Sequence, residues 1–95
     1  MYAVAGLWTM DPEQRERQDA ILHERIVPMV AAQPGFVRGA WSRETDGDRH
    51  VSFITFDTEQ AASDFVATVR ANAPAQASAG VANDELVVVE LVAEA

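Results

Sequence analysis

Cysteine is absent from this sequence of 95 residues, and lysine is absent too, because all seven basic residues are arginine. Without cysteine the chain has no disulfide, no thiolate nucleophile and no cysteine-based metal site. Two histidines alone are not a transition-metal signature, so we expect no bound metal. Nothing in the composition marks an oxidising compartment, and a cytoplasmic location is the default expectation.

Positive charge is also scarce, since the formal net charge is -8. Nucleic acids and anionic membrane surfaces both attract proteins with basic faces. The apolar start MYAVAGLWTM lacks the basic residues that open a signal peptide, and no run reaches the ~18 apolar residues of a membrane span. We therefore expect neither a nucleic-acid partner nor a membrane partner.

Turn and capping residues divide the chain into strands and helices. Strands are predicted over residues 2–8, 36–43, 49–56 and 85–92, and helices over residues 12–32 and 58–73. Asp11 and Pro12 are typical of a helix start. Pro28 predicts a bend in the same helix, and Pro34-Gly35 predicts its end. The order β-α-β-β-α-β, in one domain of residues 1–95, predicts the α+β class, a ferredoxin-like sandwich with a four-stranded antiparallel sheet and both helices on one face.

The segment QPGFVRGAWSRETDGDRHVSFITF, residues 33–56, is predicted to form a hairpin. Asp46-Gly47 is a strong two-residue turn signal. This turn places Trp41 opposite Ser52, and it pairs the opposite charges of Glu44 and Arg49. One face of the hairpin then carries Val37, Gly39, Trp41, Arg43, His50, Ser52, Ile54 and Phe56. The other face carries Phe36, Arg38, Ala40, Ser42, Val51, Phe53 and Thr55. The sequence leaves open which of the two faces the helices cover.

Both faces of the sheet are apolar, although two helices cover one face only. The last strand, ELVVVELV, adds valine and leucine on both sides. The uncovered face would be a larger apolar patch than a monomer normally exposes. We expect a second copy of the same sheet to cover it, because two-fold homodimers are the commonest assembly. Arg38, on the same hairpin face as Phe36 and Ala40, is expected to pair with an acidic residue such as Glu90, either within the sheet or across the dimer.

Two segments resemble the antibiotic biosynthesis monooxygenase family. They are Gln33-Pro34-Gly35-Phe36 before the hairpin and ITFDTEQAA, residues 54–62, after it. The resemblance implies a dimeric α+β barrel, in which two ferredoxin-like sheets pack face to face. It also implies a cofactor-independent monooxygenase of small molecules, so no cofactor is expected.

The chain departs from the family pattern at two positions. Many members have a tryptophan where this chain has Phe56, and a histidine where it has Phe65. The haem-degrading branch resembles this chain in fold, but its Asn–Trp–His set has no counterpart here. Haem degradation is therefore disfavoured.

The hairpin face with Trp41 carries the best candidate for a ligand site. Trp41, Arg43, His50 and Ser52 combine an aromatic ring with polar groups, as small-molecule pockets do. Gly39 and Ser52 are small enough to leave space beside the ring. The group would suit a small aromatic ligand such as a planar polyphenol or a quinone. The alternative is that Trp41 is a core residue and that Arg43 and His50 form the solvated end of the hairpin.

His23 is a candidate for catalysis beside His50. It follows Asp19 by four residues, on the flank of the apolar stripe of the first helix, so that Asp19 is able to orient the imidazole as a general base. The alternative is an ordinary pair of surface side chains. No dinucleotide-binding, P-loop or serine-elbow motif is present.

Two functions stay open at this point. The first is a monooxygenase-like enzyme that acts on an aromatic or quinol-type substrate. The second is a non-catalytic dimer that binds a small ligand or has a regulatory role, and the missing tryptophan and histidine favour it. An RNA-binding module with the same order of elements is excluded by the negative charge and by the lack of the aromatic sheet motif.

Overall fold

The computed structural model describes all residues from Met1 to Ala95. Its strands are β1 (Tyr2–Met10), β2 (Phe36–Arg43), β3 (Arg49–Phe56) and β4 (Val81–Glu90). Its helical segments are the 3-10 turn η1 (Pro12–Gln14), α1 (Arg15–Ile21), the π-helical turn η2 (Leu22–Ile26), α2 (Val27–Ala31), α3 (Glu59–Ala71) and α4 (Ala73–Ser78). The segments from η1 to α2 follow one another without a break and make up the first helix.

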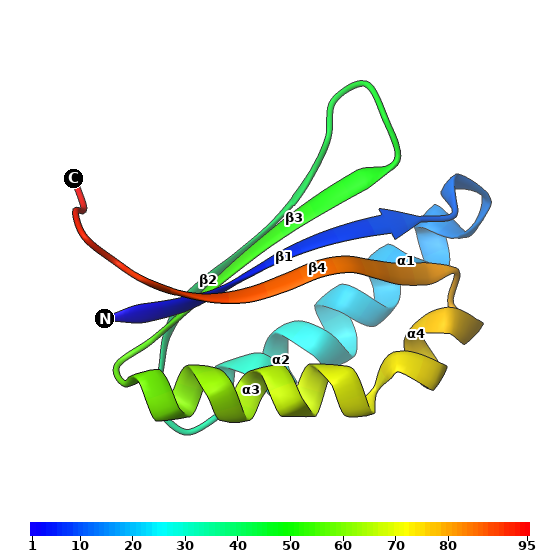
Figure 1. Cartoon of the computed structure of the whole chain (residues 1–95). Coiled ribbons are helices and arrows are strands. Elements are labelled where there is room, and N and C mark those ends of the chain that lie inside the picture. The colour runs from blue at the N-terminus through cyan, green and yellow to red at the C-terminus, as the bar shows by residue number, and fades with distance from the viewer.

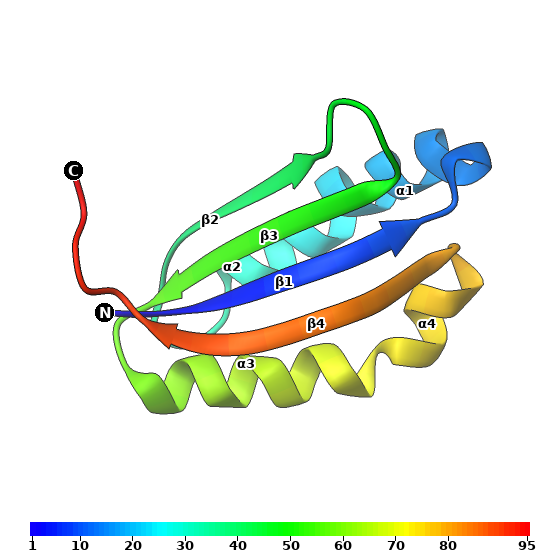
Figure 2. The same ribbon diagram turned by 45° about the horizontal axis from the view of Figure 1, so that its top comes forward.

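The four strands form one antiparallel sheet in the order β2-β3-β1-β4 (Figure 2). All helices lie on one side of this sheet, and the C-terminal segment rises on the other side (Figure 1). Right-handed crossovers in the units β1-α-β2 and β3-α-β4 place both helices on the same face. The ferredoxin-like α+β fold predicted from the order of the elements is confirmed.

The first helix starts and bends at residues that disfavour a regular helix interior. Asp11 caps it, since its carboxylate accepts a hydrogen bond from the Glu13 N–H at 3.0 Å, and Pro12 follows at the first helical position. The π turn η2 comes just before Pro28. The ring of Pro28 crowds the carbonyl of Glu24 and has no N–H to donate to it. The predicted irregularity therefore takes the form of a widened turn.

The β2–β3 hairpin has the predicted register over most of its length. Trp41 pairs with Ser52. Next to the turn, the N–H of Glu44 donates to the carbonyl of Arg49 at 2.8 Å, and the two side chains form an ion pair at 3.5 Å. The helices cover the face that carries Trp41, which packs against the core.

A β-bulge between Phe36 and Arg38 reverses the faces at the start of β2. The turn register predicts Phe36 on the face opposite Trp41, which the structure shows to be the face away from the helices. Phe36 instead packs against the core, edge to face with Phe56 at 6.5 Å between ring centroids. Val37, predicted on the same face as Trp41, is 37% exposed. An extra residue in one strand shifts the alternation of side chains by one. The turn residues give no information about this bulge, because it lies at the opposite end of the hairpin.

β4 starts earlier than predicted, at Val81 rather than at Glu85. Asn83 is typical of a loop, yet it lies within the strand beside a bulge in the β1–β4 ladder. Its side-chain amide donates to the carbonyl of Leu7 at 3.1 Å. Because β4 is an edge strand, polar side chains are tolerated there at little cost.

The core is small and fills only one end of the space between sheet and helices. Just 13 of the 95 residues are buried. The buried members of the apolar core cluster are Val4, Val30, Ile54, Phe56, Ala62, Phe65 and Val66. A chain of this length has a modest stability margin, so this end of the molecule supplies most of the burial that holds the fold together.

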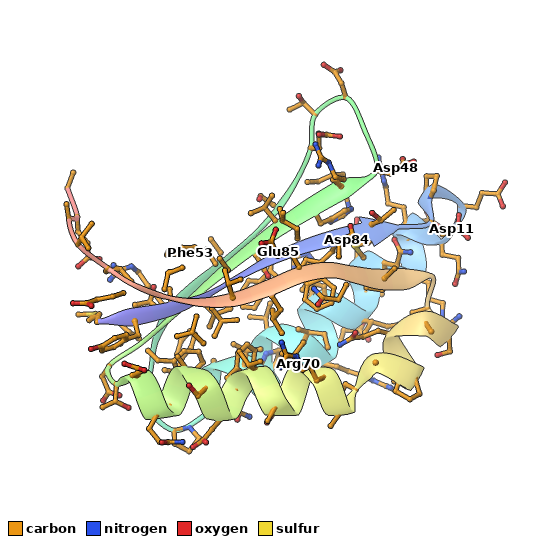
Figure 3. The ribbon with its side chains drawn as sticks, viewed as in Figure 1. Asp11, Asp48, Phe53, Arg70, Asp84 and Glu85 are labelled. Atoms are coloured by element: carbon orange, nitrogen blue, oxygen red, sulfur yellow. The ribbon has the colours of Figure 1, made fainter.

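The open face, which is the side of the sheet away from the helices, carries exposed apolar residues. Strand pairing places Ala40, Phe53, Ala5 and Val87 in one row across it. Phe53 is 41% exposed and Val87 39% exposed. Figure 3 shows Phe53 pointing away from the helices. An uncovered apolar sheet face is therefore present, as the sequence predicts.

Arg38 pairs with an acidic residue, as expected, but the partner is not Glu90. Its guanidinium pairs with Glu94 of the C-terminal segment, and the arginine side chain is 56% exposed rather than buried. Glu90, the expected partner, lies on β4 opposite Tyr2, whereas β2 is the other edge of the sheet. The two side chains are therefore separated by the width of the sheet.

The bulge leads to a direct prediction about stability. Phe36→Ala is expected to lower the free energy of unfolding by about 2–3 kcal/mol, because it removes a ring packed on the core. Val37→Ala is the matched control, and its expected cost is less than about 1 kcal/mol because Val37 faces solvent. Urea denaturation of both variants measures the difference. Equal costs, or a larger cost for Val37→Ala, would show that the two side chains have the faces that the turn register alone predicts.

Candidate functional site

A cavity of about 610 Å3 lies between the sheet and the helices. Of the 29 residues that line it, 17 are hydrophobic. Small-molecule sites have this range of sizes, and they are mostly apolar with a few well-placed polar groups. This cavity is the candidate functional site.

A second hollow, of about 270 Å3, lies at the start of α3. Only 2 of the 9 residues that line it are hydrophobic, and Asp57 and Asp64 are among the others. A small depression with a polar lining is typical of solvated surface. The larger, apolar cavity is the better candidate for binding an organic ligand.

Two rows of paired side chains form the floor of the cavity. In the strand order β2, β3, β1, one row consists of Trp41, Ser52 and Gly6, and the next consists of Arg43, His50 and Trp8. All of these residues except Gly6 line the cavity. Ser52 and Gly6 have little side-chain volume, so the packing that fills the other end of the sheet stops at this row and leaves space.

Each tryptophan lies over a glycine that precedes it on the same face of its strand. A Cβ atom on Gly6 would lie 2.6 Å from Nε1 of Trp8, and a Cβ atom on Gly39 would lie 3.1 Å from the ring of Trp41. A larger side chain at either position would displace the indole. Gly39 therefore supports Trp41, and it is not itself a lining residue of the cavity.

The hydroxyl of Ser52 connects two strands of the floor, β3 and β1. Ser52 is 7% exposed, and its Oγ accepts a hydrogen bond from the indole Nε1–H of Trp8 at 2.9 Å. Trp8 is not among the candidate residues that the sequence suggests. The available signal is the spacing Gly-x-Trp, which occurs both at Gly6-Leu7-Trp8 and at Gly39-Ala40-Trp41.

The first helix and α3 cover the cavity with apolar side chains. The main ones are Ile21, Leu22, Ile26, Met29, Phe65 and Val69. The π turn η2 belongs to this wall, and such turns are frequent at functional sites. His23 lies on η2 and borders the cavity, but its side chain is exposed.

Asp19 pairs with Arg43 rather than orienting His23. The Nη2 of Arg43 donates to the Oδ1 of Asp19 at 2.6 Å, with both side chains partly exposed. Exposed ion pairs contribute little to stability. The main effect of this pair is to hold the Arg43 guanidinium at the rim, between α1 and the end of the hairpin.

The rim of the cavity is basic, although the chain as a whole is acidic. Arg17, Arg25 and Arg43 line the cavity with Asp19 as the only carboxylate among them, whereas the net charge of the chain is -8. A local excess of positive charge attracts anionic or electron-rich groups. The rim therefore favours a ligand with phenolate, carboxylate or carbonyl oxygens.

His50 is a neutral histidine at neutral pH. Burial lowers its pKa below the ordinary value of 6.5, and the Arg43 guanidinium lowers this pKa further, while Asp19 opposes the shift. One ring nitrogen of the neutral imidazole is then free to accept a proton. His50 is thus in the state that a general base requires.

The cavity brings together most of the residues singled out in the sequence. Trp41, Arg43, His50, Ser52 and His23 all line it, so Trp41 packs on the core and also borders open space. Their roles in binding and catalysis stay predictions. The structure adds Trp8 and Gly6, whose position depends on the pairing of β1 with β3.

Two further observations bear on possible partners. No group of three or more His, Cys, Asp or Glu side chains is placed to hold a metal ion. None of the helices combines the length and the apolar character that crossing a membrane requires.

The fold and the cavity define a class of protein, namely small ferredoxin-like α+β domains with an apolar site between sheet and helices. Within this class, the profile of the family described as antibiotic biosynthesis monooxygenase matches residues 1–79. The chain belongs to the antibiotic biosynthesis monooxygenase family. No curated protein matches the sequence at a significant level.

Several solved structures share the fold over nearly the whole chain. A mutant of SnoaB, a cofactor-independent oxygenase from Streptomyces nogalater, is 21% identical with a TM-score of 0.75, covering 98% of this chain and 94% of that one. MhuD, a heme-degrader from Mycobacterium tuberculosis, is 16% identical with a TM-score of 0.72, covering 100% and 99%. The monooxygenase ActVA-Orf6 of Streptomyces coelicolor, in complex with Nanaomycin D, is 15% identical with a TM-score of 0.69, covering 99% and 89%. At these identities the likeness shows the fold alone.

The environment of His50 predicts its titration. In an NMR titration its imidazole is expected to have a pKa below 6.5, and Arg43→Gln is expected to raise that pKa by removing the nearby positive charge. Arg49→Gln, on the same strand, is the control and should leave the pKa of His50 unchanged. A pKa at or above 6.5 in the wild type would contradict the burial of the ring.

The same shift has a consequence for stability. The unfolded chain takes up a proton at His50 near pH 6.5, whereas the folded chain does so only at lower pH. Because the unfolded chain binds this proton first, the free energy of unfolding decreases as the pH falls from 6.5 towards the lowered pKa of folded His50.

Proposed function

We propose that the chain is a cofactor-independent monooxygenase that acts on an aromatic, quinol-type substrate bound in the cavity. Membership of the family supports a monooxygenase-like activity on a small molecule. SnoaB is described as a cofactor-independent oxygenase, and ActVA-Orf6 as a monooxygenase in complex with Nanaomycin D. The substrate class is our own inference from the lining of the cavity.

The observation that carries the proposal is the floor with two indoles. Trp8 on β1 and Trp41 on β2 flank the polar side chains of β3. Their strands are two spacings apart, which is roughly 10 Å. Aromatic rings bind other rings in stacked or edge-to-face arrangements. A planar ring system of a few fused rings is therefore the ligand that uses this floor best.

A quinol is able to react with oxygen without an external reductant, because it supplies the electrons itself. Loss of a hydroxyl proton gives an electron-rich oxyanion, and the ring carbon beside it takes up O2 as a hydroperoxide. Loss of water from the hydroperoxide leaves a hydroxyquinone. One oxygen atom of O2 ends in the product and the other in water.

In this reaction we assign the proton transfer to His50. Its lowered pKa keeps the imidazole neutral and ready to accept the hydroxyl proton. Arg43, held by Asp19 at 2.6 Å, supplies a fixed positive charge for the oxyanion. His23 is the second candidate for the base, at the exposed rim of the cavity.

In this proposal Trp41 and Ser52 bind the substrate, and Gly39 supports Trp41. Trp41 provides the ring surface, and Gly39 leaves that ring in place. Ser52 contributes the hydroxyl between the two tryptophans. No cofactor is required in this scheme, since the substrate and O2 balance the reaction.

A second candidate function is supported by one observation. Phe56 and Phe65 stand where many family members have tryptophan and histidine, and both are buried in the core cluster. These positions hold no group able to transfer a proton. A dimer that binds an aromatic ligand without oxidising it is the function that these two residues favour.

Oxygen uptake separates the two functions. With a naphthohydroquinone, the wild type is expected to consume O2 faster than autoxidation does and to produce water rather than hydrogen peroxide. His50→Asn is expected to reduce kcat by about 100-fold or more if His50 is the base. Loss of activity in His23→Asn instead would assign the base to His23.

The control for this experiment is Ser63→Ala, an exposed position on α3 that lies outside the cavity. The rate is expected to decrease only at pH values below 6.5, where His50 takes up a proton and loses the neutral form that acts as the base. Binding measured by calorimetry without any enzymatic oxygen uptake would favour the non-catalytic function.

We also propose that the chain is a homodimer that buries the open face of each sheet. Val51, Phe53 and Val87 on this face are 44%, 41% and 39% exposed. Phe53 stands between Ala40 and Ala5, so its ring projects above small neighbours and a second copy is able to pack around it. Association of two such faces is driven by apolar burial.

A cytoplasmic location stays a prediction from the composition.

The dimer is tested by a change at the centre of the open face. Phe53→Asp is expected to halve the mass measured by sedimentation equilibrium at micromolar concentration, because it places a charge in the apolar interface. Ala67→Asp adds the same charge on the outer side of α3 and should leave the dimer intact. A monomeric wild type would remove the argument for this interface.

A further inference from the structure

Ser52 uses only part of its hydrogen-bonding capacity within the chain. Its side chain is 7% exposed and lines the cavity. Its Oγ accepts a hydrogen bond from Trp8 Nε1 at 2.9 Å. A serine hydroxyl has a proton to donate as well, and within the chain no acceptor receives it. An enclosed donor without an acceptor is a feature that a ligand is able to satisfy.

We propose that Ser52 donates this hydrogen bond to an oxygen of the aromatic ligand, and that Trp8 is the positioning residue that aims the hydroxyl. This inference rests on the proposed ligand site and specifies its chemistry further. The ligand atom at Ser52 is an acceptor, namely a carbonyl or phenolate oxygen. A ring system of the same size without such an oxygen binds less well.

The indole of Trp8 acts on the direction of the Ser52 proton. An indole N–H only donates, so it occupies a lone pair of Oγ and leaves the hydroxyl proton to point elsewhere. A hydroxyl that accepts one hydrogen bond is also a better donor for the next. Trp8 therefore orients and polarises the hydroxyl group that donates to the ligand.

Gly6 permits this arrangement. A Cβ atom at this position would lie 2.6 Å from the Oγ of Ser52 and 2.6 Å from the Nε1 of Trp8. A methyl group would thus be placed against both partners of the hydrogen bond. Trp41, which pairs with Ser52 from the other side, borders the cavity with its ring and is the matched comparison for Trp8.

The selectivity for an acceptor follows from the cost of leaving a donor unpaired. Binding a pure hydrocarbon would enclose the Ser52 proton without a partner, and a buried unpaired donor is unfavourable. Sites built around a hydrogen bond reject analogues that lack the matching group. The measurable quantity is the ratio of the affinities for two ligands, one with the acceptor oxygen and one without it. A general change in the shape or stability of the protein would affect both affinities and leave their ratio the same.

The experiment compares 9-fluorenone with fluorene, two planar compounds that differ in one carbonyl oxygen, by isothermal titration calorimetry on the full chain. The wild type is expected to bind fluorenone about 2- to 12-fold more tightly. Ser52→Ala should bring the ratio close to one. Trp8→Phe, which keeps a ring and removes the N–H, should reduce the preference by at least half.

Trp41→Phe is the control for the loss of a tryptophan, and it should weaken both compounds equally and keep the ratio. Gly6→Ala should reduce the ratio as Trp8→Phe does, provided that its circular dichroism matches the wild type. Equal affinities of the wild type for the two compounds would overturn this inference alone. Failure of both compounds to bind would overturn the proposed function together with it. A ratio that Trp8→Phe leaves unchanged would restrict the effect to Ser52 and remove the positioning role of Trp8.

Discussion

The pairing of β3 with β1 on one side and β2 on the other is the constraint on which the site depends. These two registers bring Gly6 and Trp41 to either side of Ser52, and Trp8 and Arg43 to either side of His50. A slip of one residue in either ladder would turn the polar side chains of β3 to the opposite face. The cavity, the lowered pKa of His50 and the hydrogen bond from Trp8 to Ser52 all follow from the alternation of side chains along the strands.

Much of this arrangement is predictable from local sequence, because the decisive signal is local. The Asp46-Gly47 turn predicts the β2–β3 register, and with it the shared face of Trp41, His50 and Ser52. The β1–β3 register has no turn of its own, so the contact of Trp8 with Ser52 stays hidden. The bulge after Phe36 and the partner of Asp19 depend on packing between distant segments, which residue patterns do not encode.

The location of the cavity has a physical cost that the rest of the chain must absorb. Small residues at Gly6 and Ser52 leave the floor unfilled at one end of the sheet, and the core cluster fills only the other end. The open face adds a second area of apolar side chains that the chain itself leaves exposed. A domain of this size has few ways to compensate, which makes a bound ligand and a partner sheet natural sources of additional stability.

Both tryptophans of the chain border the cavity, so the protein has a built-in optical reporter of its own site. Its tryptophan emission comes entirely from the floor of the cavity, without a background from elsewhere in the fold. The two indoles differ in their surroundings, because the N–H of Trp8 is hydrogen-bonded to Ser52. Replacing either one would leave a single emitter, and the spectrum would then follow one wall of the cavity at a time.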